Sequence, residues 1–201
     1  MAILKKILKW GAITLASAFV ILVAVRTVHF FNLDKTNAQV AKIHATKLTL
    51  DDVMGKNLPP DPGAEADKTV QGIDANKNGI RDDVELAIFK EYPNSAKTRA
   101  VLLQYALTMQ LQMTLPIVNA DTVTAIVEDN ESRANWCLWG LSSRANMDKF
   151  EVETSFREHF VADRQLNTEQ RKKYHHDFYD SMQSYSASRG GCDIDLNTLP
   201  N

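Results

Sequence analysis

The chain has 201 residues, 44% of them hydrophobic, and its 23 Lys and Arg residues nearly balance its 25 Asp and Glu residues, for a formal net charge of −2. All the acidic residues lie at or after Asp34, together with 19 of the basic ones, so this larger part of the chain carries a net charge near −6. This negative excess argues against nucleic-acid binding, which requires a basic surface, and we expect no nucleic-acid partner.

The first predicted element is an apolar helix flanked by positive charge. Lys5, Lys6 and Lys9 precede an uncharged run over residues 10–25, and Arg26 ends it. A helix of that length extends about 24 Å, which is less than the ~30 Å hydrocarbon core of a bilayer. Apolar residues on both sides lengthen the run, and the flanking basic side chains can snorkel to the interfaces. We therefore expect a transmembrane helix.

Two alternatives exist for this segment. Ala16-Ser17-Ala18 has the form of a signal-peptide cleavage site, but cleavage there would split the apolar run, which favours an uncleaved signal anchor over residues 1–31. The clustered lysines argue against the other alternative, a helix of a soluble core. Their position before the run indicates a cytoplasmic N-terminus. The sequence thus predicts a single-pass protein of the inner (cytoplasmic) membrane, which contacts lipid through residues 7–31 and has a periplasmic C-terminal domain.

Residues 32–63 are predicted to connect the anchor to the rest of the chain. A juxtamembrane helix is expected over residues 37–47, and a Pro-rich linker follows at Leu58-Pro59-Pro60-Asp61-Pro62-Gly63. The exported domain is then expected to occupy residues 64–201, which is enough chain for one domain with its own core.

Residues 74–85 carry the most specific pattern in the chain. They fit the calcium-loop motif D-x-[DN]-x-[DN]-G-x5-E at every constrained position. Calcium prefers six to eight oxygen ligands, and Gly79 permits the sharp turn with which one short loop supplies them. The expected Ca2+ ligands are Asp74, Asn76, Asn78, the backbone carbonyl of Ile80, Asp82 and Glu85.

This loop resembles an EF-hand loop, and more closely the D-x-D-x-D-G-I-x-D loops of thrombospondin type 3 repeats and their bacterial relatives. In an EF-hand, position 8 is usually aliphatic and pairs with a second loop, whereas here position 8 is Arg81 and the aliphatic Ile80 precedes it. Residues 58–92 also resemble a segment of uncharacterised membrane-anchored bacterial proteins that carry Pro-Pro-Asp-Pro-Gly shortly before such a loop. The resemblance implies calcium binding and brings no known activity.

The alternative to a metal site is an Asx-rich surface turn that only begins a helix. If calcium binds, the two Asn ligands and the nearby Lys77 and Arg81 weaken the negative field. We expect a dissociation constant on the order of 10⁻⁴–10⁻³ M, as in extracellular calcium modules. A site of this strength suits a structural role in an exported compartment.

The rest of the domain is predicted to be an irregular helical bundle, because apolar residues recur at helical spacing and strand-like alternation is nearly absent. The fold class is therefore mainly α, with a transmembrane helix followed by this bundle and one calcium-type loop. The expected helices cover residues 82–92, residues from Asn94 or Ser95 to Thr114, residues 121–146, and a segment around Phe150, Phe156 and Phe160. The helix ending at Thr114 is apolar almost all round, so it should be central.

A last helix is expected to begin at an Asn167 cap, with Gln170 at the capping-box position. Gly190-Gly191 should end it. Its core-facing residues are predicted to be Tyr174, Phe178, Met182 and Tyr185, and its solvated face to contain Arg171, Lys172 and Lys173.

The two cysteines, Cys137 and Cys192, suit an exported protein. In an oxidising compartment they are expected to form a disulfide. In the chain-entropy model, closing a loop of this length stabilises the folded state by about 4 kcal/mol. Two separate thiols, with Cys137 simply buried on a helix, are the alternative. Trp136 and Trp139 beside it could mark a binding surface, although such residues more often belong to a core.

Catalysis has weak support in the sequence. His159 with Asp163 and His176 with Asp180 are each four residues apart, and His175 lies beside them. Acid–base or metal chemistry would require them to converge in a pocket. The H-E-x-x-H, G-x-S-x-G and Walker A patterns are absent. We expect no catalytic residues.

Three functions follow from these features. The first is a membrane-tethered, exported calcium-binding protein that acts as a structural or interaction module with a protein partner. The second is a periplasmic inhibitor or immunity-type protein that binds an enzyme. The third, with the least support, is an envelope hydrolase that uses the His and Asp groups.

Overall fold

The computed structural model describes residues 2–115, 119–182, 184–187 and 190–200. Within this part of the chain the protein is mainly helical and has no strand, which confirms the predicted fold class. The chain divides into two compact units, residues up to Gln39 and residues from Val40 onward.

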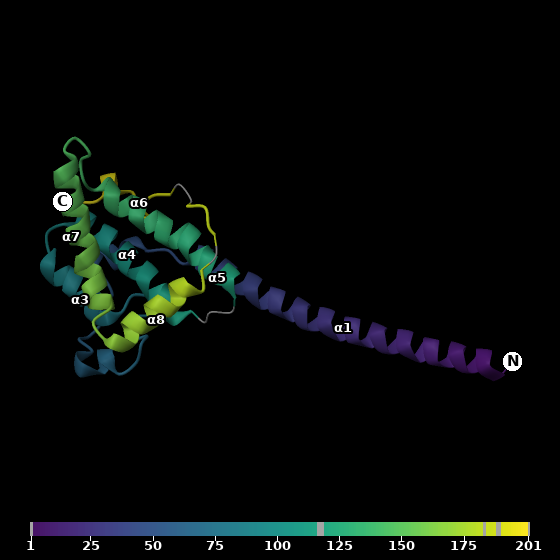
Figure 1. Cartoon of the computed structure of the whole chain (residues 1–201). Helices are drawn as coiled ribbons and strands as arrows, with labels where there is room; N and C mark the ends of the chain where they lie inside the picture. The colour runs from purple at the N-terminus through teal and green to yellow at the C-terminus, as the bar shows by residue number, and fades with distance from the viewer. Residues whose placement is uncertain (1, 116–118, 183, 188–189, 201) are drawn as a thin grey trace. The chain divides into compact units, whose positions relative to one another are not determined.

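Eleven helical segments are described (Figure 1). They are α1 (Ala2–Ala45), α2 (Leu50–Met54), the 3-10 helix η1 (Gly63–Asp67), α3 (Asp82–Glu91), α4 (Ala96–Thr114), α5 (Ala120–Ala125), the π-helical segment η2 (Ile126–Glu131), α6 (Ser132–Gly140), α7 (Met147–Gln165), α8 (Glu169–Asp180) and the 3-10 helix η3 (Leu196–Thr198).

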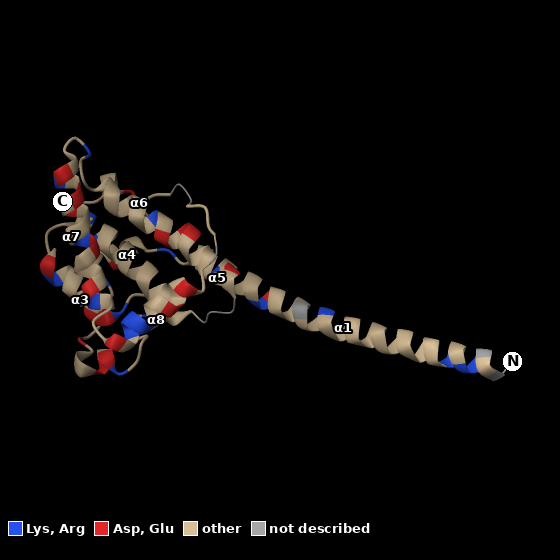
Figure 2. Cartoon of the chain, in the orientation of Figure 1, with Lys and Arg blue, Asp and Glu red and all other residues tan. Residues whose placement is uncertain are grey.

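The first unit is made by α1, which is long and apolar enough to cross a membrane, with a mean hydropathy of 2.0. Figure 2 shows its basic residues near the N-terminal end and an uncharged stretch after them. Trp10 and Phe19 are both 67% exposed. The separate helix expected over residues 37–47 is instead the end of α1, which stops at Ala45.

In the second unit, α4 is the central helix, as predicted. It contacts α2, α3, α6, α7 and α8, and most of its side chains are buried on every side. Its N-terminus is set locally, because the Ser95 hydroxyl accepts the N–H of Thr98 at 3.2 Å. The helix ends at Thr114, which is the predicted residue.

The single helix expected over residues 121–146 is wrong in two respects. First, the helical run contains the π-helical segment η2 between α5 and α6. Its carbonyls have additional donors: the Thr108 hydroxyl bonds the carbonyl of Asn130 at 3.2 Å, and the Ser132 hydroxyl bonds that of Val127 at 2.9 Å. Second, α6 ends at Gly140, and Asn146 begins a new helix instead of ending the old one. Asn146 is the N-cap of α7, and its side chain accepts the N–H of Lys149 at 3.0 Å.

The last helix also differs from the prediction. Thr168, and not Asn167, is the N-cap of α8, because the Asn167 side chain bonds Asp67 at 3.0 Å and also binds Arg171. The helix ends at Asp180, so Gly190-Gly191 do not end it. Tyr185 lies beyond the helix and is 47% exposed, whereas Phe178 is buried as expected.

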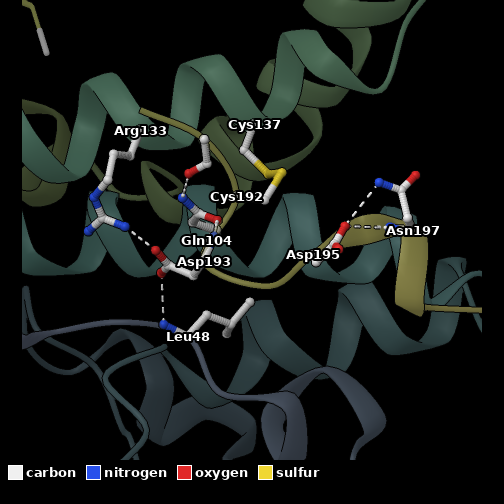
Figure 3. Close-up of a disulfide and its surroundings, with 9 residues drawn as sticks. Leu48, Gln104, Arg133, Cys137, Cys192, Asp193, Asp195 and Asn197 are labelled. Atoms are coloured by element: carbon white, nitrogen blue, oxygen red, sulfur yellow. Dashed lines mark hydrogen bonds and ion pairs between the residues drawn. A yellow bond between two sulfur atoms is a disulfide. The ribbon is translucent and has the colours of Figure 1, made fainter. Parts of the chain in front are cut away.

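Cys137 and Cys192 form a disulfide with their Cα atoms 4.6 Å apart, which confirms that prediction. The residue that follows, Asp193, fastens the C-terminal segment to the bundle (Figure 3). Its carboxylate accepts bonds from Arg133 and from the backbone N–H of Leu48, and its own N–H donates to Gln104 at 2.8 Å. The C-terminal segment is thereby tied to α4, α6 and the turn after α1.

Candidate metal site

The predicted calcium loop connects the segment after η1 to α3. Its last four residues, from Asp82, form the first turn of α3, and Arg81 is the N-cap residue. Asp82, Asp83 and Glu85 therefore stand at the positive end of the helix dipole, where negative charge is favourable. The loop and the start of α3 are one structural unit.

Side-chain oxygens of the loop are bonded to its own backbone. The two carboxylate oxygens of Asp74 accept the N–H groups of Asn78 at 3.1 Å and Gly79 at 2.9 Å. The amide oxygen of Asn76 accepts the same Asn78 N–H at 3.3 Å, and that of Asn78 accepts the N–H of Ile80 at 2.9 Å. Side-chain oxygens of positions 1 and 3 thus accept the same backbone N–H, and these contacts close the loop.

Gly79 is required by both conformation and space. Its φ is +85°, in the left-handed region where a side chain is unfavourable. A Cβ built there would lie 2.8 Å from Cδ1 of Leu107 on α4. The next residue, Ile80, is completely buried in the core with Val84 and Ile88. The loop backbone is therefore held against α4 at positions 6 and 7.

Two buried carboxyls have no basic partner among their described contacts. Glu85 is 1% exposed and accepts a bond from the Asn76 amide at 3.1 Å. Burial raises its pKa to about 7, partly opposed by the hydrogen bond from Asn76. Asp82 is completely buried and accepts the N–H of Ala75 on both oxygens. Burial also raises the pKa of Asp82.

This donor set fits a hard divalent cation. A buried carboxylate without a positive partner is costly, and a cation supplies the missing charge. The groups around the loop are carboxylate, amide and carbonyl oxygens, which calcium prefers. A cavity of about 400 Å³ borders the loop at Asp74 and Asn78, and its other lining residues include Gln110 and Thr114 of α4 and two lysines, Lys42 and Lys77.

The Arg81 charge, which was expected to weaken the field of the loop, is paired with other groups. The Arg81 side chain is completely buried and forms a bidentate ion pair with Asp83, at 2.6 and 2.8 Å. It also donates to the carbonyls of Arg164 at 2.5 Å and Gln165 at 3.2 Å, at the C-terminus of α7. Its charge is thereby matched by Asp83 and by the negative end of α7. Position 8, which pairs with a second loop in an EF-hand, here attaches the loop to α7.

A second buried arginine supports the segment before the loop. Arg171 of α8 was predicted on a solvated face, but it is completely buried. It donates to Asp67 at 2.6 Å and to the carbonyls of Ala66, Thr69 and Val70. The hydrogen bonds from Asn167 and Arg171 lower the pKa of Asp67. A signal for this role existed, because Arg171 precedes the core residue Phe178 by two helical turns and so lies on the same face.

The histidines do not form one catalytic centre in the described structure. His159 bonds Ser155 on its own helix, at 2.7 Å to the carbonyl. His176 forms an exposed pair with Asp180 at 3.5 Å. His175 packs edge-on against Tyr179, and burial lowers its pKa. No hydrogen bond or ion pair joins these groups to one another among the described residues.

Among the described residues, no three His, Cys, Asp or Glu side chains gather closely enough to form a metal site on their own. A metal in the loop would therefore depend on the Asn amides and a backbone carbonyl in addition to the carboxylates. No protein-family model matches the chain, and neither the curated proteins nor the solved structures include a significant match to it.

Proposed function

We propose that the protein is a membrane-tethered calcium-binding module of an exported compartment, in which Ca2+ organises the helices behind the loop. The observation that carries this proposal is the pair of buried carboxyls, Glu85 and Asp82, at the two last ligand positions of the loop, neither with a basic partner among the described contacts. A surface turn that merely begins a helix has no need to bury two carboxyls at the base of that helix.

Calcium at this position would act on the bundle through three connections. The loop continues directly into α3, which packs on α4. Gly79 and Ile80 hold the loop against α4 and the core. Arg81 joins the loop to the end of α7. The ion would thus favour the folded arrangement of α3, α4 and α7 together, as any ligand of the native state does.

Independent features support the proposed exported compartment. The basic residues before the apolar part of α1 favour a cytoplasmic N-terminus and an exported second unit. The Cys137–Cys192 disulfide is of a kind that persists in oxidising compartments. Calcium is abundant outside the cytosol, so a dissociation constant on the order of 10⁻⁴–10⁻³ M would suffice there.

The test is calorimetric and thermal, on the full chain in a nonionic detergent freed of metal with a chelator. We expect Ca2+ to bind with a one-to-one stoichiometry and to raise the melting temperature, and Mg2+ to do so much more weakly, because the smaller ion dehydrates reluctantly. Glu85→Gln should abolish the rise in melting temperature. Glu91→Gln, an exposed residue at the end of the same helix, is the matched control and should retain it.

Wild-type protein with no binding heat and no change in melting temperature at millimolar calcium would refute the proposal. Equal rises in melting temperature for wild type and Glu85→Gln would place the ion elsewhere. In the first case, the loop would be stabilised by its own Asx turns alone.

A further inference from the structure

A second candidate site lies on the bundle, away from the calcium loop. It is a cleft of about 200 Å³ between α6 and the described segment 184–187. Its walls include Trp136, Trp139 and Tyr185, and Glu131 and Asn135 also line it. The segment that closes it is attached to η2 by the backbone N–H of Ser186, which donates to Glu128 at 2.9 Å.

The aromatic rings form a corner. Trp136 and Trp139 are three residues apart on α6, their ring centroids are 5.8 Å apart, and their planes are inclined by 68°. Trp139 is oriented by its ring N–H, which donates to Glu158 at 3.3 Å. Trp136 and Tyr185 remain 37% and 47% exposed. Large aromatic side chains left partly open to solvent around a cleft are typical of a binding surface.

Glu131 places a carboxyl in this aromatic cleft. One of its oxygens accepts both the Tyr179 hydroxyl at 2.7 Å and the Gln112 amide at 3.1 Å. Both donors are neutral, and the described contacts do not engage the other oxygen. Burial raises the pKa of Glu131, as expected for a carboxyl without a positive partner. Glu131 ends the π-helical segment, a local form that recurs at functional sites.

The nearby basic side chains do not neutralise Glu131. Arg133 bonds Asp129 at 2.9 Å and also Asp193. The Arg144 guanidinium lies over one face of the Trp136 ring, 5.8 Å from the ring centroid, and Arg144 is not among the residues that line the cleft. The other face of Trp136 is therefore the one left for a ligand. None of the described lining residues is basic. The cleft thus combines aromatic rings with a carboxyl that has no basic partner among the described residues.

We propose that this cleft binds a compact organic ammonium ion, with Glu131 opposite the positive charge and the faces of Trp136, Trp139 and Tyr185 around it. Aromatic faces attract such cations, most strongly where water is excluded. The small volume admits a head group of the size of choline or ethanolamine. An anion would meet the carboxyl and is disfavoured.

The experiment uses the full chain in a polyoxyethylene detergent, which carries neither an ammonium group nor a sugar. Choline is titrated by calorimetry and by tryptophan fluorescence, in parallel with 3,3-dimethylbutan-1-ol, which has the same shape but a carbon in place of the charged nitrogen. Ethanolamine and N-acetylglucosamine form two further arms. We expect saturable binding of choline or ethanolamine and at least tenfold weaker binding of the neutral alcohol.

Variants locate the binding. Glu131→Gln keeps the shape and the acceptor for Tyr179 but removes the charge, and it should weaken ammonium binding at least tenfold. Trp136→Leu should do the same, and because this side chain is partly exposed it tests the cleft even if Glu131→Gln unfolds. Glu151→Gln, exposed on α7, is the control and should bind as wild type does.

Three results would overturn the proposal: no saturable binding of either ammonium compound, equal affinity for the neutral alcohol, or preference for the sugar. A lipid head group and a free amine share this chemistry. The two are distinguished by repeating the titration with short-chain phosphatidylethanolamine against ethanolamine, and tighter binding of either one assigns the source.

Discussion

Replacing Glu85 by Gln should change stability in opposite directions with and without calcium. The pKa of Glu85 rises from an ordinary 4.5 to about 7 because the carboxyl is buried. A tenfold change in an ionisation constant corresponds to about 1.4 kcal/mol, so ionising this group in the fold costs up to roughly 3 kcal/mol. Polarisable groups and relaxation around the carboxyl offset part of this cost, and we expect about 1–2 kcal/mol. Without calcium, near pH 8, Glu85→Gln should raise the free energy of unfolding by that amount.

The stability difference between wild type and Glu85→Gln depends on pH. Because the folded pKa lies above the unfolded one, the stability that protonated Glu85 contributes is fully present below about pH 4.5 and is lost as pH rises through about 7. The metal-free wild type and Glu85→Gln should therefore coincide at the acidic end and diverge towards pH 8. The free energy of unfolding from urea denaturation, measured in chelator across this range, gives the difference directly.

Calcium should reverse the order of stability of wild type and Glu85→Gln. Binding to the native state adds about 1.4 kcal/mol at ten times the dissociation constant and about 2.7 kcal/mol at a hundred times. Wild type gains this and the variant does not, so in saturating calcium the wild type becomes the more stable protein. A variant that is less stable than wild type in chelator at pH 8 would refute the reasoning, because Glu85 would then be stabilised in the fold by a partner other than a metal ion.

The remaining predictions concern the supports of the site. Gly79→Ala should cost about 1–3 kcal/mol through strain and overlap with α4, whereas Gly63→Ala, also at positive φ but in open space, should cost less; urea denaturation in chelator compares them. Cys137→Ser should lower the free energy of unfolding by about 4 kcal/mol, and a reductant should reproduce this in wild type only. Arg171→Met should cost about 2–4 kcal/mol by leaving buried carbonyls without donors, while exposed Lys172→Met should leave the melting temperature unchanged.

The candidate metal site could be predicted to the extent that it is local. The Asx contacts join residues at most five positions apart, and all the expected ligands lie within twelve consecutive residues, so the chain carries this pattern before it packs. The sequence did not predict the burial of the two arginines that support the loop and the segment before it. Arg81 and Arg171 look like surface charges in a linear pattern, because a buried arginine depends on acceptors far away in the chain. Their partners at Gln165 and Asp67 are 84 and 104 residues distant.

The same division holds for the whole protein. The sequence alone determined the apolar N-terminal helix, the C-terminal end of α4 and its start within one residue, since these arise from composition or from neighbours in the chain. It favoured the disulfide, which the number of cysteines and the expected compartment indicate but which the packing of α6 against the C-terminal segment makes possible. Only the tertiary structure decided the π-helical turn at Glu131, the early end of α8 and the cleft beside Trp136. These depend on which distant hydroxyl, amide or ring meets the backbone when the helices pack, and no local pattern encodes that.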